Sequence, residues 1–312
     1  MTSLGSLRRM SSLISRYLAP LIIVLSIALG FSLPQVGVIW KPYLSLLLMF
    51  LMFFVALSIE PNEIARATRN YSVTMVGLFT VFVMVPVLAL SAKPFVSSIV
   101  YAGIILALCC PSAVVSAFWA KAFKGDVATA LVMSITTNLL SIVTIPATML
   151  IAIGTALRVD VASMMLNLAE IILVPLVASF LLRRFVHLDW NRASLFSSKA
   201  ELCILALIVW GSIAPGVEYV RNNIGEFAML NAFMLGILAL AWTLTHFVTK
   251  GFGQKKAASL KIATTVKNAA LSLVVGLAAF GPQVLPPLIE PLIANLIAQN
   301  LLLILAKTLT EE

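Results

Sequence analysis

The feature that most constrains this chain is a succession of apolar segments, each close to the length that a helix needs to cross a bilayer. Such a crossing takes about 20 residues, and backbone groups in lipid must find partners within the helix itself. Of the 312 residues, 61% are hydrophobic and 11% are charged. We therefore predict an all-α integral membrane protein, a single unit over residues 1–312 with ten transmembrane helices. The segments are approximately Leu18–Leu33, Tyr43–Ile59, Val73–Leu90, Val96–Ala120, Ala128–Gly154, Val161–Leu182, Leu202–Ala214, Phe227–Val248, Leu260–Gly281 and Val284–Ala306.

The distribution of basic residues predicts how these segments lie in the membrane. With the amino terminus inside, 16 lysines and arginines fall on the cytoplasmic side and four in the outer loops. Cytoplasmic loops typically carry such an excess. We expect a multi-pass protein of the plasma (cell inner) membrane with both termini cytoplasmic. The cytoplasmic set is Arg8, Arg9, Arg16, Arg66, Arg69, Lys121, Lys124, Arg183, Arg184, Arg192, Lys199, Lys250, Lys255, Lys256, Lys261 and Lys307. The outer set is Lys41, Lys93, Arg158 and Arg221.

These loops also explain the formal charge of +9, so no nucleic-acid partner is expected. Cys109, Cys110 and Cys203 form neither a disulfide framework nor a zinc-binding spacing. We find no nucleophile elbow and no glycine-rich phosphate loop. We therefore expect a protein that is not an enzyme and has no catalytic residue, no metal site and no cofactor. Its expected partners are the bilayer and a small solute, and its oligomeric state is left open.

Two segments contain residues that fit poorly in a continuous apolar helix. Pro111 lies in the middle of the long fourth segment, just before Ser112 and Ser116. Lys267 and Asn268 lie well inside the ninth segment. If the ten segments divide into five plus five, these two segments occupy corresponding positions in halves of opposite orientation. Interrupted helices at matching positions indicate the binding site of a transporter, near the middle of the membrane.

Lys267 permits two interpretations. A charged side chain at this depth is costly and normally faces a cavity or a partner inside the bundle, which makes Lys267 a candidate for a transport site. The alternative is a structural lysine that snorkels to the interface or pairs with one carboxylate. Glu170 and Glu290 are the candidate partners. Glu290 is favoured because its segment follows that of Lys267 through a tight turn, although this turn also places Glu290 nearer the outer face.

Polar side chains on neighbouring segments complete the candidate site. Ser134, Asn138 and Ser141 recur at i, i+4 and i+7, so they share one face of the fifth helix. A hydroxyl in a membrane helix often bonds only the carbonyl four residues earlier, whereas a buried asparagine is costlier. The candidate substrate- or ion-binding residues are Ser112, Ser116, Ser134, Asn138, Thr264, Lys267, Asn268 and Glu290.

The segment Cys109–Asp126, CCPSAVVSAFWAKAFKGD, resembles the fourth-helix motif of the bile acid:sodium symporter family. Leu57–Asn70 and Val266–Pro282 resemble its second-helix exit and its ninth-helix motif. The resemblance covers nearly the whole chain and implies a five-plus-five inverted repeat that transports organic anions by alternating access. It also implies a panel and a core, in which broken helices 4 and 9 cross. The panel would comprise about residues 18–59 and 161–214, and the core about residues 73–154 and 227–306.

The chain departs from this family at positions that the family's symporters use for sodium. After the fourth-helix break they carry a Ser-Asn pair, whereas here Ser116 is followed by Ala117. On the fifth helix they carry two hydroxyls one turn apart, and here these positions are Ala130 and Ser134. The resemblance therefore does not extend to an intact sodium site.

On the ninth helix, this chain lacks the family's acidic residue and carries a basic residue nearby. The family's glutamate position is Ala263, its glutamine position is Lys267, and its asparagine is kept as Asn268. An ammonium about 4 Å from a sodium ion would cost roughly 4 kcal/mol at an effective dielectric constant of about 20, a factor near a thousand in affinity. We hypothesise that Lys267 replaces the sodium charge, supports the helix crossing and attracts an anionic substrate. Sodium is then not expected as the coupled ion, and a proton is the possible substitute.

The leading hypothesis is a secondary transporter of a small organic anion, such as a bile acid or another carboxylate. A second hypothesis is an arsenite or metalloid efflux carrier, since those carriers share the Gly125–Asp126 turn and Glu290 precedes Pro291 as in their tenth helix. Their cysteine follows the fourth-helix proline, however, whereas Cys110 precedes Pro111. A third, of another class, is a membrane sensor or scaffold that transports nothing. The sequence does not identify the substrate, the coupling ion or the direction of transport.

Overall fold

The computed structural model describes residues 21–58, 71–113, 115–154, 160–186, 190–280 and 285–311, and within these ranges the chain is helical, with no named strand. Six helical stretches there are long and apolar enough to cross a membrane, and four shorter apolar helices accompany them. The six are Tyr71–Ala92, Val127–Ile153, Val161–Phe185, Lys199–Asn222, Ile224–Val248 and Pro286–Thr308. The four are Leu21–Ser32, Lys41–Leu57, Ser98–Cys109 and Ala269–Ala279.

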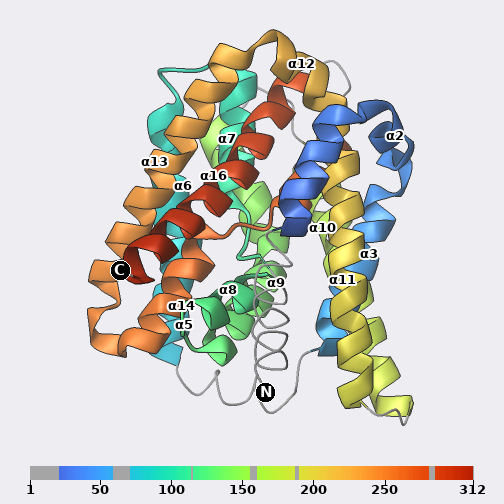
Figure 1. Cartoon of the computed structure of the whole chain (residues 1–312), viewed down its shortest axis with the longest axis vertical. Coiled ribbons are helices and arrows are strands. Elements are labelled where there is room, and N and C mark those ends of the chain that lie inside the picture. Colours follow the sequence, from blue (N-terminus) through green and yellow to red (C-terminus); the bar gives the residue numbers. More distant parts are fainter. Residues whose placement is uncertain are drawn as a thin grey trace, which may run out of the picture.

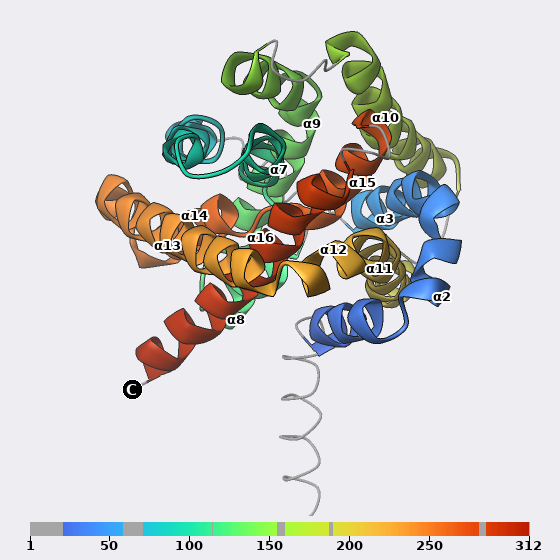
Figure 2. The same cartoon turned by 90° about the horizontal axis from the view of Figure 1, so that it is seen from above.

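The helices pack into two groups, which Figures 1 and 2 both show side by side. In the smaller group, α3 packs against α10 and α11, and α2 packs against α11. Its members are α2 (Pro34–Ile39), α3 (Leu44–Ser58), α10 (Val161–Phe185) and α11 (Trp190–Ile213). In the larger group, α16 packs against α7, α13 and α15, and α14 packs against α8, α9 and α13. Its members are α5 (Tyr71–Phe79), α6 (Val85–Ala89), α7 (Ser98–Cys109), α8 (Ser116–Ala122), α9 (Val127–Ile153), α13 (Ile224–Val248), α14 (Gln254–Thr265), α15 (Ala269–Ala279) and α16 (Leu285–Glu311).

The outward faces of these helices are apolar, as a surface in contact with lipid requires. On α10, for example, Leu166 is 72% exposed and Phe180 is 64% exposed. A water-soluble helix would carry polar side chains on its outer face. Backbone groups on such a face are satisfied by the helix itself, which is what lipid demands. The surface pattern therefore supports a protein embedded in a bilayer.

The fourth predicted segment is interrupted, as Pro111 led us to expect, because α7 ends at Cys109 and the chain becomes helical again only at Ser116. The seventh segment, predicted at about Leu202–Ala214, is longer in the structure, since α11 begins at Trp190. After α11, the 3-10 turn η4 (Ala214–Gly216) and α12 (Val217–Asn222) continue this stretch. The turn between the ninth and tenth segments, residues 281–284, lies outside the described residues.

Polar caps fix where the helices next to the breaks begin. Asp126 caps α9, accepting hydrogen bonds from the Ala128 amide (3.2 Å) and the Thr129 hydroxyl (2.7 Å). Asn268 caps α15, accepting from the Leu271 amide (3.1 Å). Each cap satisfies a backbone N–H that has no partner inside its helix and contributes about 1 kcal/mol. The start of α15 is therefore defined by the polar residue directly after Lys267.

Candidate functional site

The site is built where two helices are interrupted at the same depth. Cys110 has an extended backbone (φ −61°, ψ 151°), as expected of a residue before proline, and this ends α7 at Cys109. In the second interrupted helix, α14 stops at Thr265 and Val266 is also extended (φ −89°, ψ 91°). Both predicted interruptions, at Pro111 and at Lys267, coincide with these breaks.

The two extended stretches pair as a short antiparallel bridge between Ser112 and Lys267. The Ala113 amide donates to the Val266 carbonyl, and the Asn268 amide donates to the Pro111 carbonyl, both at 2.8 Å. Backbone groups freed by the breaks are thereby satisfied inside the bundle, which is the condition for non-helical backbone at membrane depth. The interrupted helices are thus joined to each other at this crossing.

A cluster of polar side chains connects α9 to the crossing. The Asn138 amide donates to the carbonyl oxygens of Ser112 (3.1 Å) and Ser134 (2.7 Å), and its own oxygen accepts from the Asn268 amide (3.1 Å). The Ser134 hydroxyl points at the same Ser112 carbonyl (3.5 Å). The Thr137 hydroxyl accepts from the Ser112 backbone amide (3.1 Å). The predicted residues Ser112, Ser134, Asn138 and Asn268 therefore lie together.

Ser116 and Ser141 play smaller parts at this cluster. The Ser112 hydroxyl donates to Ser116 at the start of α8 (3.2 Å), which joins the two sides of the first break. Ser141 bonds only the Asn138 carbonyl within its own helix (2.6 Å). Ser116 therefore contacts the crossing, and Ser141 shows the intrahelical bond that isolated hydroxyls usually make.

Lys267 is fully buried, and its ammonium does not point to the bilayer surface. Its Nζ donates to the Val81 carbonyl at 3.1 Å, and its backbone amide donates to Gln299 Oε1 on α16 at 2.8 Å. Val81 lies in a π-helical segment, η2 (Thr80–Met84), between α5 and α6. The lysine thus joins three elements: its own break, the π-helical segment and α16.

The free carbonyl at Val81 is explained by Pro86. In a π-helix a carbonyl pairs with the N–H five residues later, as Thr80 does with the Val85 amide. For Val81 that residue is Pro86, which has no N–H to donate. A carbonyl left without a partner in the interior is costly, and the Lys267 ammonium takes the place of the missing donor. Pro86 therefore creates an acceptor for the buried charge.

Thr264 lies one turn before the break and bonds to the same π-helical segment. Its hydroxyl and that of Thr80 are 2.7 Å apart, and both residues are fully buried. Thr264 therefore supports the contact between α14 and η2. Its hydroxyl also lies 2.8 Å from the Leu260 carbonyl in its own helix, and neither bond involves the asparagine cluster.

Glu290 does not pair with Lys267, although the sequence favoured it. Its carboxylate is fully buried, and neither oxygen has a hydrogen-bond partner among the described residues. The 11 residues of α15 carry the chain roughly 16 Å away from the crossing before α16 returns. Glu290 lies near the start of that return, and Gln299, nine residues later, meets the lysine instead. Glu170 is exposed on α10 and makes no ion pair with Lys267 either.

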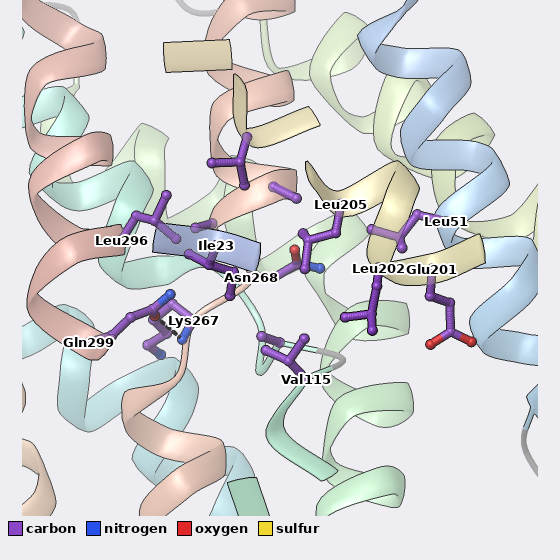
Figure 3. A pocket seen from close by; sticks show the side chains of 14 residues that line it. Ile23, Leu51, Val115, Glu201, Leu202, Leu205, Lys267, Asn268, Leu296 and Gln299 are labelled. Carbon is purple, nitrogen blue, oxygen red and sulfur yellow. Dashed lines mark hydrogen bonds between the residues drawn. The ribbon is translucent and has the colours of Figure 1, made fainter. Parts of the chain in front are cut away.

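A cavity of about 60 Å³ lies beside the crossing, between the two helix groups. Figure 3 shows Lys267, Asn268 and Gln299 on one side of it, and Leu51, Leu202 and Leu205 on the other. A second cavity of about 40 Å³ lies next to Ser134 and Asn138, against α3 and α10. Both are large enough for water or part of a small solute. The polar cluster therefore borders small cavities where the two groups meet.

This combination of interrupted helices, polar crossing and bordering cavities agrees with a comparison of the sequence with family models. Residues 19–311 match the model of the SBF-like CPA transporter family. The chain belongs to this family. As an SBF-like protein it is a multi-pass membrane transporter, and the resemblance to bile acid:sodium symporters is confirmed at the level of the family.

Curated relatives of this SBF-like protein extend over most of its length. It is 25% identical over 284 residues to the uncharacterized protein YbaS of Bacillus subtilis, which covers 86% of this chain and 90% of the relative. It is 20% identical to the uncharacterized sodium-dependent transporter YocS of the same organism, covering 83% and 81%. It is 22% identical to the probable sodium/metabolite cotransporter BASS2, chloroplastic, of Oryza sativa, covering 71% and 53%.

Four contributors to the site were not among the predicted residues: Thr80, the Val81 carbonyl, Thr137 and Gln299. Gln299 forms a polar stripe with Asn295 and Asn300 on the tenth segment, and Thr137 directly precedes Asn138, so the residue types of both were visible signals. Thr80 and Val81 lie in a segment that reads as an ordinary apolar helix. The one sequence signal there is Pro86, and its effect depends on the five-residue register that only the structure reveals.

Proposed function

We propose that this protein is a secondary transporter that moves a small organic anion across the membrane by alternating access, with Lys267 supplying the positive charge at its site. The observation that carries the proposal is the buried Lys267 ammonium at the crossing of the two interrupted helices, 3.1 Å from the Val81 carbonyl. A cation placed there lowers the cost of bringing an anion into a low-dielectric interior. The cavity beside Lys267 and Asn268 would admit the anion's charged group.

The architecture behind this proposal has ten transmembrane helices in a five-plus-five inverted repeat. The interrupted pairs α7–α8 and α14–α15 would be the equivalent fourth and ninth helices of the two halves. The smaller helix group would be the panel and the larger group the core. The excess of basic residues on one side favours cytoplasmic termini in the plasma membrane. Alternating access would then be a movement of the core against the panel.

Lys267 also bears on the coupling ion. A sodium ion about 4 Å from this ammonium would be repelled by roughly 4 kcal/mol. We therefore propose that transport does not use the sodium sites of bile acid:sodium symporters. A proton gradient is the alternative driving force, since Lys267 is a titratable group at the crossing. Without either gradient, the protein would act as a uniporter or an exchanger.

Sodium coupling is the competing proposal, because two relatives carry "sodium-dependent" or "sodium/metabolite cotransporter" in their names. A specific feature of this chain favours it: Ser112, Ser134, Thr137 and Asn138 gather hydroxyl, amide and carbonyl oxygens at one point. Such oxygens are ligands that hard cations prefer. This cluster would have to hold sodium far enough from the ammonium to avoid its repulsion.

The deciding experiment is flux of candidate carboxylates into proteoliposomes, with sodium and proton gradients imposed separately. We expect uptake without sodium, and a loss of that uptake by about tenfold or more in Lys267→Gln, since one removed charge contact is worth about 1.4 kcal/mol or more. Lys256→Gln on α14, which removes a charge away from the crossing, is the matched control. Uptake that requires sodium and ignores a pH gradient, or a Lys267→Gln variant with normal flux, would contradict the proposal.

A further inference from the structure

A cavity much larger than the one beside Lys267 lies away from the transport site. It has a volume of about 800 Å³, is open on one side and is bordered by α8, α13, α14 and α16. Figure 1 shows α13, α14 and the carboxyl end of α16 together at one side of the molecule, and Figure 2 shows the same grouping from above. None of the residues that line this cavity also lines the cavity beside Lys267. It is therefore a separate feature of the larger helix group.

All of the charged residues that line this cavity are basic. Lys124, Lys261 and Lys307 line it, and none of its lining residues is acidic. Lys261 is half-buried, and its Nζ lies 4.8 Å from the ring centre of Trp242, which also lines the cavity. No carboxylate in the described part of the chain forms an ion pair with Lys261. A desolvated ammonium needs a counter-charge, and an aromatic ring supplies only part of one. The cavity is therefore suited to an anion.

Apart from Thr243 and Gln254, the remaining walls of the cavity are apolar. Leu235, Leu302 and Leu305 line it together with the aromatic rings of Phe123 and Trp242, which lie 5.7 Å apart. A small inorganic anion would leave these walls uncovered. A molecule with a charged head and a hydrocarbon tail would cover both the lysines and the leucines. The lining thus favours an amphiphile over a free ion.

The cavity also reaches the ends of several helices. Lys124 lies two residues after the end of α8 at Ala122, Gln254 begins α14, and Lys307 lies in the last turn of the stretch Pro286–Thr308. Ends of spanning helices lie near the lipid headgroups, where basic pockets between helices bind anionic heads. We propose that this cavity binds an anionic phospholipid, with the phosphate on Lys124 and Lys261 and an acyl chain along the leucines.

Such a lipid would contact both interrupted helices. Lys124 follows α8, and Lys261 is on α14, the halves that lead into the crossing from this side. The two are already tied together nearby, since the Asp126 amide donates to the Lys255 carbonyl (3.1 Å) and the Ser259 hydroxyl donates to the Asp126 carbonyl (2.7 Å). A bound phospholipid would add a second connection between them, and it would stabilise the larger helix group independently of any transported solute.

The test uses the full-length protein in detergent, titrated with a short-chain phosphatidylglycerol while thermal unfolding and lipid retention by native mass spectrometry are followed. Phosphatidylcholine of equal chain length and inorganic phosphate are the comparison ligands. We expect a rise in melting temperature with phosphatidylglycerol alone. In Lys124→Gln/Lys261→Gln the dissociation constant should rise about 25-fold, since each lysine near a lipid charge contributes a factor of about five.

Two matched variants make the result decisive. Lys121→Gln/Lys250→Gln removes the same charge from neighbouring positions outside the cavity and should bind normally. Lys124→Arg/Lys261→Arg keeps the charge and should also bind, which separates lost binding from lost folding. Equal stabilisation by inorganic phosphate would replace the lipid with a free anion and overturn the proposal. Equal loss of binding in both glutamine variants, or equal stabilisation by phosphatidylcholine, would overturn it as well.

Discussion

At the scale of single residues, the contact between Asn138 and Asn268 connects α9 to the second interrupted helix. Each side chain also has a separate task, because Asn138 donates to the Ser112 carbonyl and Asn268 caps α15. Buried amides are expensive unless all of their groups are bonded, so the two residues depend on each other. Their 3.1 Å hydrogen bond is therefore the place to measure how strongly α9 is coupled to the crossing.

A double-mutant cycle on this pair should show strong coupling. Asn138→Ala and Asn268→Ala each leave buried partners unsatisfied, so each should lower the free energy of unfolding by about 1–3 kcal/mol. The double variant should lose less free energy of unfolding than the two single variants lose in sum, with an interaction energy of about 0.5–3 kcal/mol between the two sites. Unfolding in one detergent would measure this. Asn231→Ala is the control, because its amide bonds only within α13, to the Phe227 carbonyl. If the two single losses in the free energy of unfolding simply add in the double variant, the contact between Asn138 and Asn268 does not couple the two helices.

At the scale of helical elements, the π-helical segment η2 leaves the Val81 carbonyl without a backbone partner, because Pro86 has no N–H to donate. Pro86→Ala would restore a donor for the Val81 carbonyl, and the Lys267 ammonium would then compete for it. We expect the free energy of unfolding to stay equal or rise, since a proline is removed from a helix interior. We expect flux to fall, since Lys267 loses its fixed acceptor. Flux in proteoliposomes and thermal unfolding check both parts.

The matched control for this substitution is Pro175→Ala. Pro175 also lies inside a helix, but on α10 in the smaller group, away from Lys267. It should gain a similar amount of stability without loss of flux. Normal flux in Pro86→Ala would show that the Val81 carbonyl does not position the lysine for transport.

The packing of α7 on α16 depends on Gly103. A Cβ atom at this position would overlap the Leu288 carbonyl oxygen and lie 2.5 Å from Pro291 Cγ, so the helices could not approach as closely. Gly103→Ala should destabilise the protein by about 1–3 kcal/mol, the usual cost of overpacking. Gly236→Ala on α13 meets no atom within 4 Å and should be neutral or stabilising. Melting temperatures of the two variants check this, and an unchanged Gly103→Ala would contradict it.

The interruptions were predictable from sequence because their causes are local. Pro111 restricts the residue before it, and Lys267 with Asn268 places costly polar groups in an apolar segment. The residue types alone are therefore enough to predict where the helices break. Most members of the polar cluster were predictable from spacing, since Asn138 and Ser134 lie four residues apart and share one helix face.

The partner of Lys267 was not predictable, because it depends on how far each element carries the chain. The tight turn after α15 suggested Glu290, but the length of that helix takes Glu290 away from the crossing and brings Gln299 to it. The Val81 carbonyl becomes available only through a change of helical register. Both effects depend on helix length and helical register in three dimensions, and a short sequence motif predicts neither of them.

At the scale of the whole molecule, alternating access predicts that the two helix groups move against each other. Gly216 follows α11, and a Cβ atom built on it lies 3.3 Å from Ile289 Cβ on α16. This is close to the separation in disulfides. Gly216→Cys/Ile289→Cys should therefore cross-link the groups when oxidised. We expect flux to be abolished by oxidation and restored by a reducing agent, measured in a background without the exposed Cys203.

A second pair provides the control with the same geometry. A Cβ atom on Gly30 also lies 3.3 Å from Ile213 Cβ. Gly30 lies in the helix Leu21–Ser32 and Ile213 ends α11, so both residues fall within the proposed panel. Gly30→Cys/Ile213→Cys should cross-link equally well and leave flux intact. Equal flux in both oxidised variants would show that the groups do not move apart at this point, and it would count against the proposed mechanism.

The cap on α15 has one more consequence, which concerns the polarity of any solute that reaches Asn268. Its Oδ1 is held by the Leu271 amide, so the direction of this side chain is fixed by the backbone and only its NH₂ group faces Asn138. A solute that displaces Asn138 must accept a hydrogen bond there. A carboxylate can do so and leave α15 capped, whereas a bare cation would meet the positive end of the amide dipole. Under the proposed function, the orientation of this one amide would favour an anionic solute over a cation.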